Sequence, residues 1–123
     1  MRGQMMAFPL TIPALLRRAE TFWRARPVIT RAPDRSIVRS NYGVCVRRAR
    51  QLAVALKRAG IQPGDRVATF AWNHQSHLET YFGVPMAGAV LHTLNLRLHP
   101  GDLGYIVEHA DDSAIVLDAS LAD

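Results

Sequence analysis

The sequence is poor in two residue types that build covalent or charged sites: among 123 residues it has one cysteine, Cys45, and one lysine, Lys57. A single cysteine cannot close an internal disulfide, which indicates a reducing compartment and a cytoplasmic location. A phosphate-binding lysine would have to be Lys57, which falls on the polar side of a predicted helix. No apolar run approaches the ~20 residues that cross a bilayer, so any membrane contact is expected to be peripheral.

A secretory leader is not expected either, although residues 1–31 hold six arginines and one acid, Glu20. Pro9 and Pro13 interrupt the apolar stretch that a signal peptide would need unbroken. An arginine-rich transit peptide fits better, but the same residues can form a first amphipathic helix, which we favour. Apolar residues make up 49% and charged residues 20%. This composition is typical of one globular domain, and no linker or repeat indicates a boundary.

Charge is divided unevenly along the chain. Residues 1–66 carry 14 basic and three acidic residues, a balance of +11, whereas residues 67–123 carry Arg97 and seven acids, a balance of −6. A basic half can attract nucleic acid or acidic lipid. The arginines, however, fall mostly on the polar sides of two predicted helices, and aromatic residues are not interleaved with them as a stacking platform requires. Nucleic acid is therefore not expected as a partner.

The first 60 residues predict a helix, a hairpin and a second helix. Apolar residues recur at helical spacing over Ile12–Trp23, with Thr11 as the cap and Pro27 ending the pattern. Residues 28–31 and 36–39 flank the turn pair Pro33-Asp34 and predict a hairpin. The second helix is expected to begin at the cap Asn41 and to end at Gly60 in a left-handed conformation.

The second half predicts three strands that alternate with helices. Residues 67–71, 89–94 and 114–117 are nearly continuous apolar runs, typical of strands buried on both faces. The helix before the second strand is expected to end near Pro85 and to close at Gly88. Connections of this length imply parallel pairing with right-handed crossovers. The predicted fold is α/β: a partial doubly wound parallel sheet (βαβαβ) preceded by a helix and a β-hairpin.

The histidines are candidates for metal ligands or bases. His74 and His77 with nearby Glu79 have the minimum spacing for a metal pair, but two further ligands have no source and the spacing matches no strong zinc motif. His92, inside a predicted buried strand, is expected to be a hydrogen-bonded core residue. His99 and His109 are expected in loop and helix-end positions. No metal site is predicted.

Nucleophilic and phosphate-binding motifs are equally weak. Cys45 falls on the apolar stripe of the second helix, where burial raises the pKa of a thiol. Ser76 shares a helix with His77 and Glu79, whereas triad members converge from different elements. Residues 83–88 contain two glycines but lack the Lys-Ser/Thr of a phosphate loop, which indicates a helix terminus.

Trp72 and Asn73 leave two interpretations open. They follow the first predicted strand at its carboxyl end, the edge at which open α/β sheets place ligands. Alternatively Asn73 caps the next helix and Trp72 packs in the core, which is the interpretation that we favour. On that basis no catalytic, cofactor-binding or metal residue is assigned to the chain.

Several segments in sequence order resemble the N-terminal part of fatty-acyl-CoA synthetases, members of the adenylate-forming superfamily. The stretch Ala87-Gly88-Ala89 through Leu94-Asn95 matches an early family motif, and residues 95–98 (Asn-Leu-Arg-Leu) resemble its Asn-Pro-Arg-Leu continuation with leucine in place of proline. At residues 41–45 the family's Thr/Ser-Tyr-x-Glu/Asp-Leu has lost its acid and leucine. The other resembling segments are Gly64-Asp65-Arg66-Val67-Ala68, Ala71-Trp72-Asn73-His74, His77-Leu78-Glu79, Tyr81-Phe82 and His109-Ala110-Asp111-Asp112.

The resemblance implies that full-length members use ATP and magnesium to convert a fatty acid into an acyl-adenylate, then pass the acyl group to coenzyme A. Residues 1–123 would be the leading part of the N-terminal AMP-binding domain, without the phosphate-loop half and the C-terminal domain. Such a truncated chain is not expected to bind cofactors or to catalyse alone. Its expected partner is a second copy or a complementary synthetase chain. The alternative is a non-catalytic interaction module that pairs with a full-length synthetase or self-associates.

Overall fold

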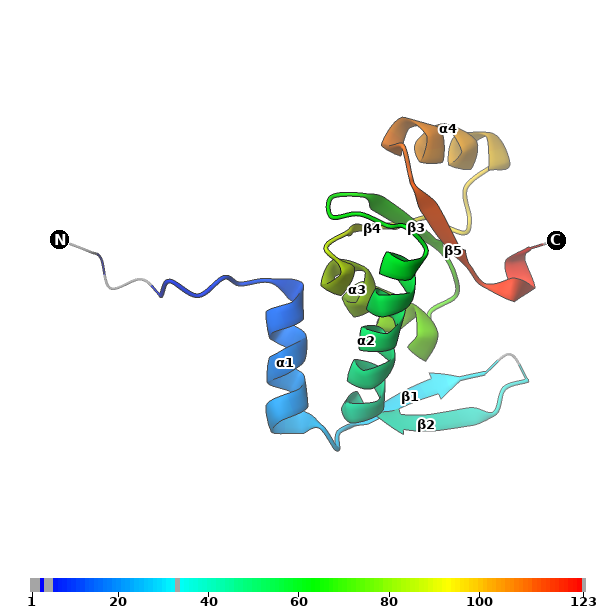
Figure 1. Cartoon of the computed structure of the whole chain (residues 1–123). Coiled ribbons are helices and arrows are strands. Elements are labelled where there is room, and N and C mark those ends of the chain that lie inside the picture. Colours follow the sequence, from blue (N-terminus) through cyan, green and yellow to red (C-terminus); the bar gives the residue numbers. More distant parts are fainter. Residues whose placement is uncertain (1–2, 4–5, 33, 123) are drawn as a thin grey trace.

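The computed structural model describes residues 3, 6–32 and 34–122. The first helix, α1 (Ile12–Trp23), stands beside α2 (Tyr42–Arg58) and packs on it through the buried Leu16 (Figure 1). The predicted helix is confirmed. Thr11 occupies the position before it, but its side chain makes no capping hydrogen bond, so the predicted side-chain cap is wrong. The backbone carbonyl of Thr11 accepts from Ala14 and Leu15 instead.

The predicted hairpin is also confirmed. Strands β1 (Pro27–Arg31) and β2 (Ile37–Asn41) pair antiparallel, with Pro27 opposite Asn41. In the turn, Oδ1 of Asp34 accepts the backbone N–H of Ser36 at 2.9 Å, an Asx-type bond. Arg35 has a positive φ of 69°. Pro33, which the sequence predicts to set this turn, lies outside the described residues.

Helix α2 begins and ends as its sequence predicts. The Asn41 side chain accepts the N–H of Val44 at 3.0 Å, and Gly60 follows the helix with φ 98°. The apolar positions of α2 face α3 (Gln75–Ala87). Pro85 lies in the last turn of α3, and the helix closes at Gly88 with φ 91°.

Three strands form a parallel sheet in the order β4-β3-β5. The central strand β3 (Arg66–Phe70) pairs with β4 (Val90–Thr93) and with β5 (Ala114–Leu117), and Ala68 lies opposite both His92 and Ile115. Helix α3 connects β3 to β4, and α4 (Pro100–Ala110) connects β4 to β5. A short 3-10 turn, η1 (Ala119–Leu121), follows β5. The predicted βαβαβ order and parallel pairing are therefore confirmed.

Burial of the strands differs from the prediction. The middle of β3 is buried, but β4 and β5 are edge strands whose side chains are exposed or half-buried. Ile115 is 48% exposed. The reason is that the main apolar cluster joins α2 and α3 to one face of the sheet, whereas α4 has no buried residue. None of the helices in the described residues combines the length and apolar character that crossing a membrane requires.

Candidate functional site

Polar side chains meet where β3 and β5 end and α3 begins. His74 is the N-cap of α3: its Nδ1 accepts the backbone N–H of His77 at 3.1 Å. Its Nε2 lies 2.7 Å from Oδ2 of Asp118, which directly follows β5. The hydrogen bond from His74, helped by the backbone and hydroxyl of Ser120, lowers the pKa of Asp118 to about 2. Asp118 is therefore a fixed anion at neutral pH, with both oxygens engaged.

The structure contradicts both structural roles that the sequence favoured at this edge. Trp72 is 52% exposed rather than packed in the core, and its Nε1 donates to Oγ of Ser120 at 3.2 Å. Asn73 is not the cap of α3, because His74 holds that position. The two residues turn outward because the chain leaves β3 at the uncovered end of the sheet and does not enter the helix until Gln75.

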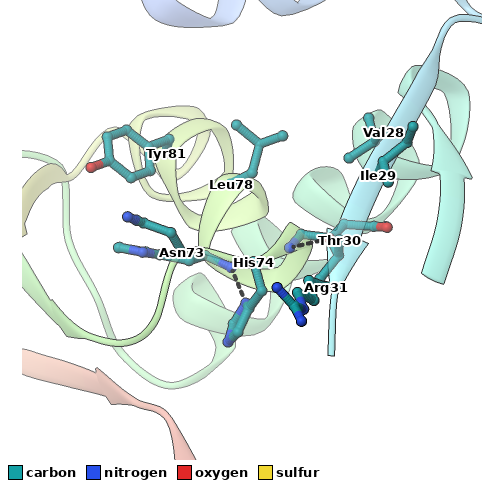
Figure 2. Close-up of a pocket in the computed structure, with 10 residues that line it drawn as sticks. Val28, Ile29, Thr30, Arg31, Asn73, His74, Leu78 and Tyr81 are labelled. Atoms are coloured by element: carbon teal, nitrogen blue, oxygen red, sulfur yellow. Dashed lines mark hydrogen bonds between the residues drawn. The ribbon is translucent and has the colours of Figure 1, made fainter. Parts of the chain in front are cut away.

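Asn73 instead lines a groove between β1 and the start of α3, which we call the edge groove (Figure 2). The edge groove has a volume of about 340 Å³. The backbone N–H of Gln75 donates to Oγ1 of Thr30 at 3.1 Å and thereby holds the hairpin against α3. The lining residues are Val28, Ile29, Thr30, Arg31, Asn73, His74, Gln75, His77, Leu78 and Tyr81. This mixed lining sits at the edge where open α/β sheets bind ligands.

His77 is the most buried residue of that lining. Its Nε2 lies 3.1 Å from Oγ1 of Thr69 on β3, and its ring packs 5.2 Å from the ring of Tyr81. Burial lowers the pKa of His77, and the neighbouring His74 lowers it further. His77 is hydrogen-bonded to the central strand and therefore acts as a core residue that joins α3 to the sheet.

Glu79 does not join these histidines in a metal site. Nε of Arg48 donates to both carboxylate oxygens of Glu79, at 2.8 and 2.9 Å, and Nε2 of Gln75 donates at 2.8 Å. The carboxylate is nearly fully buried and already satisfied. Within residues 3, 6–32 and 34–122, no three metal-ligating side chains converge.

The other three histidines have structural roles. Nδ1 of His92 contacts Asp112 at 2.8 and 3.0 Å, so His92 is hydrogen-bonded as predicted, although it is half-buried rather than enclosed. His99 caps α4 by accepting the N–H of Gly101, and His109 stacks on Tyr105 in the last turn. These positions match the predicted loop and helix-end placements.

Neither the nucleophile candidates nor the lysine lie in a reactive setting. Cys45 is fully buried, and burial together with the nearby Glu79 carboxylate raises the pKa of its thiol to about 11. Ser76 is exposed on α3, and Lys57 is exposed in the last turn of α2. Gly83 lies inside α3 against Leu52, which confirms that residues 83–88 are a helix and its terminus.

Asp118 and Ser120, which hydrogen-bond to His74 and Trp72, belong to no recognised sequence motif. A signal for them was present: Asp118 follows the third apolar run just as Trp72 and Asn73 follow the first. Because parallel strands end at the same edge of a sheet, the residues after each run can meet. Arg48 gave no such signal, since one arginine among thirteen in residues 1–66 cannot be distinguished by pattern.

Comparisons with known proteins show the family of this chain. The family model described as AMP-binding enzyme matches residues 17–123. The 3-methylmercaptopropionyl-CoA ligase of Ruegeria lacuscaerulensis is 40% identical over 120 residues, which cover 98% of this chain and 22% of the ligase. The long-chain-fatty-acid–CoA ligase of Thermus thermophilus is 40% identical over 129 residues, which cover 98% of this chain and 24% of that ligase.

A solved structure agrees with the sequence matches. The fatty acyl CoA synthetase of Mycobacterium tuberculosis superposes with a TM-score of 0.79 and 27% identity, over 91% of this chain and 22% of the synthetase. The chain thus spans about a fifth to a quarter of the length of these relatives. Because the family model covers most of the chain, the chain belongs to the AMP-binding enzyme family.

Proposed function

We propose that residues 1–123 form the leading part of the N-terminal AMP-binding domain of an acid–CoA ligase that activates a fatty acid. The relatives that support this proposal are named as CoA ligases of 3-methylmercaptopropionate and of long-chain fatty acids. In this role the chain supplies the sheet, the helices and the polar side chains at the carboxyl ends of β3 and β5. The phosphate loop and the C-terminal domain come from polypeptide outside residues 1–123, in the same or another chain.

The superposition of this chain on a fatty acyl CoA synthetase, which covers 91% of the chain, carries the proposal. The chemistry of the described residues supports a scaffold role. His74, Glu79 and His92 are each committed to a carboxylate or guanidinium partner, and the Cys45 thiol is buried. Each of these contacts joins two elements that are distant in the sequence.

ATP, magnesium and coenzyme A are the cosubstrates that the family resemblance implies. Gly83 and Gly88 do not form a phosphate loop for ATP–magnesium, because Gly83 lies inside α3 and Gly88 is the C-cap of that helix. Gly83 also packs against α2: a Cβ on it would lie 2.8 Å from Cδ2 of Leu52. We therefore assign no step of the reaction to residues of this chain.

A chimera tests the proposal. The first ~22% of the Ruegeria ligase, the part that this chain matches, would be replaced by residues 1–123, and acid-dependent exchange of pyrophosphate into ATP would be measured. We expect exchange within about tenfold of the parent, a change of ~1.4 kcal/mol in barrier height. The isolated chain should give no exchange above blank. A folded but inactive chimera, or exchange by the isolated chain, would contradict the proposal.

A second candidate function, an interaction module, is favoured by one surface. Apolar side chains from β3, β5 and α4 line a groove of about 530 Å³, which we call the α4 groove. Its lining residues are Phe70, Leu94, Leu103, Gly104, Val107, Glu108, Ile115 and Leu117. An uncovered apolar face beside an edge strand favours pairing with another chain. Light scattering of the purified chain tests this function.

A further inference from the structure

The cap of α3 is a titratable side chain. Nδ1 of His74 accepts the backbone N–H of His77 at 3.1 Å, and an imidazole nitrogen can accept a hydrogen bond only while it carries no proton. Helix α2 begins differently: the amide oxygen of Asn41 accepts the N–H of Val44 at 3.0 Å, and an amide does not titrate. The start of α3 therefore depends on the protonation of its cap, whereas the start of α2 does not.

A carboxylate on the other side of the His74 ring gives the charged imidazole a partner. Nε2 lies 2.7 Å from Oδ2 of Asp118, and the hydrogen bonds from His74 and Ser120 lower the pKa of that carboxyl to about 2. Asp118 is thus an anion throughout the range in which histidines titrate, about pH 5 to 8. A proton on Nδ1 removes the acceptor of the His77 N–H but leaves the contact with Asp118, which becomes a charge-assisted hydrogen bond. The ring then keeps one of its two partners.

Charged and titratable groups near the His74 ring also come from the hairpin, α2 and α3. They line the edge groove or the neighbouring groove of about 440 Å³ together with His74, and they are Arg31, Arg39, Arg48, His77 and Glu79. Arg48 and Glu79 are paired with each other at 2.8 Å. Burial lowers the pKa of His77, and His74 lowers it further, so a charge on His74 opposes a second charge on His77. A single proton on His74 is therefore the change that acid brings to this part of the molecule.

The first turn of α3 also holds the hairpin in place. The backbone N–H of Gln75 donates to Oγ1 of Thr30 on β1 at 3.1 Å, and Nε2 of Gln75 donates to Glu79 at 2.8 Å. Dashed lines in Figure 2 mark the capping bond at His74 and the bond to Thr30, which lie close together at the start of the helix. Because Gln75 directly follows the cap, a change in the backbone at His74 reaches Thr30 through one residue.

We propose that His74 is a proton-operated switch at the start of α3. When acid protonates Nδ1, the N–H of His77 loses its acceptor, and His74 remains paired with Asp118. The first turn of α3 then opens more often, and the contact of Gln75 with Thr30 loosens with it. Acid thus changes the walls of the edge groove while the buried cluster between α2, α3 and the sheet stays folded. This proposal does not depend on the proposed ligase function.

Amide hydrogen exchange of the full chain, followed residue by residue by NMR between about pH 8 and 5, tests the proposal. Each exchange rate is divided by that of an unstructured peptide at the same pH, so that the pH dependence of the exchange reaction cancels. We expect the protection of the His77 amide to fall about fivefold, the typical effect of losing one cap. The Val44 amide, which Asn41 caps, is the matched control in the same molecule and should keep its protection. Nitrogen chemical shifts of the His74 ring report the proton on Nδ1 over the same range.

Two variants separate a switch from a cap that is only structural. His74→Asn keeps a capping oxygen but cannot titrate, so the protection of the His77 amide should no longer depend on pH. Asp118→Asn removes the anion that favours the charged imidazole, so the midpoint of the change should move to lower pH. The proposal is overturned by constant protection of His77 in the unsubstituted chain, by a parallel loss at Val44, by an unaltered pH dependence in His74→Asn, or by an unmoved midpoint in Asp118→Asn. If a variant does not fold, the comparison of His77 with Val44 in the unsubstituted chain still decides.

Discussion

His74 and Asp118 join two segments that are far apart in the sequence, with Nε2 of the histidine 2.7 Å from Oδ2 of the carboxylate. Nδ1 of the same imidazole accepts the N–H of His77, so the ring proton lies on Nε2 and is donated to Asp118. One side chain therefore caps α3 and holds the end of β5. This double role fixes the edge of the sheet on which Trp72 and Asn73 lie.

Replacing Asp118 with Asn should remove a pH-dependent part of the stability. The hydrogen bond from His74 lowers the pKa of Asp118 to about 2, below its value of about 3.9 in an unfolded chain. Because the folded pKa is the lower one, this stabilisation is complete above about pH 4 and is lost as the pH falls toward 2. Near neutral pH the variant should unfold with ~1 kcal/mol less free energy.

Urea unfolding of both proteins across this pH range measures the effect. The difference between Asp118→Asn and the unsubstituted chain should be present near neutral pH and should close as the pH falls below about 4. A difference that stays constant down to pH ~2 would show that the ionised carboxylate is not what stabilises the edge.

His74→Ala should destabilise the chain more than Asn73→Ala. The first change removes the cap of α3, typically ~1 kcal/mol, and also the donor to Asp118. The second removes a side chain that lines the edge groove, with an expected effect within ~0.5 kcal/mol. Thermal melts of the two single variants distinguish the cap positions. Equal loss of stability, or a larger loss for Asn73→Ala, would restore Asn73 as the cap.

Most elements were predictable because their signals are local. Asn41 before an apolar repeat predicts a capped helix, and Gly60 and Gly88 adopt the left-handed conformations that end α2 and α3. The polar contacts at the carboxyl ends of β3 and β5 were less predictable, because they include a hydrogen bond between His74 and Asp118, which are 44 positions apart. Trp72 was placed wrongly for the same reason. Its hydrophobic side chain favours the core, but it follows the carboxyl end of the central strand β3, where it is half-exposed.

Burial of the outer strands also escaped prediction for a physical reason. A continuous apolar run such as residues 114–117 indicates two covered faces. The sequence of a strand does not indicate which helices cover each face of the sheet. In the structure, α2 and α3 cover one face, and Ile115 and Leu117 stay about half-exposed beside α4.

Gly83→Ala and Gly104→Ala should have opposite effects on stability. A Cβ on Gly83 would lie 2.8 Å from Cδ2 of Leu52 and 3.0 Å from the backbone oxygen of Ala49, so α2 and α3 would have to separate. The expected loss is about 1–3 kcal/mol. A Cβ on Gly104, in α4, meets no atom within 4 Å, and alanine there should stabilise the helix by ~0.5–1 kcal/mol. Chemical denaturation of both variants measures the two signs, and a neutral Gly83→Ala would mean that the helix pair tolerates the shift.

The thiol of Cys45 should react only when the chain unfolds. It is fully buried, and burial with the Glu79 carboxylate raises its pKa to about 11. Near pH 8 both the thiolate fraction and the access of a reagent are therefore low in the folded state. We expect a disulfide reagent to label the chain slowly in buffer and rapidly in urea. Equally fast labelling in both conditions would show that α2 opens without global unfolding.

Self-association through the α4 groove is the last expected outcome. Ile115 is 48% exposed on the edge strand β5 and lines that groove, so a second chain that covers it gains apolar burial and backbone pairing. We expect assemblies larger than the monomer at ~10–50 μM. Ile115→Gln should shift them toward monomer, because a polar side chain weakens the apolar contact.

Val54→Gln is the matched control. Val54 is equally exposed, but it lies on α2 among arginines, and its replacement should leave the assembly unchanged. Multi-angle light scattering separates these outcomes, and a clean monomer of the unsubstituted chain with cooperative unfolding would show that the α4 groove needs no partner.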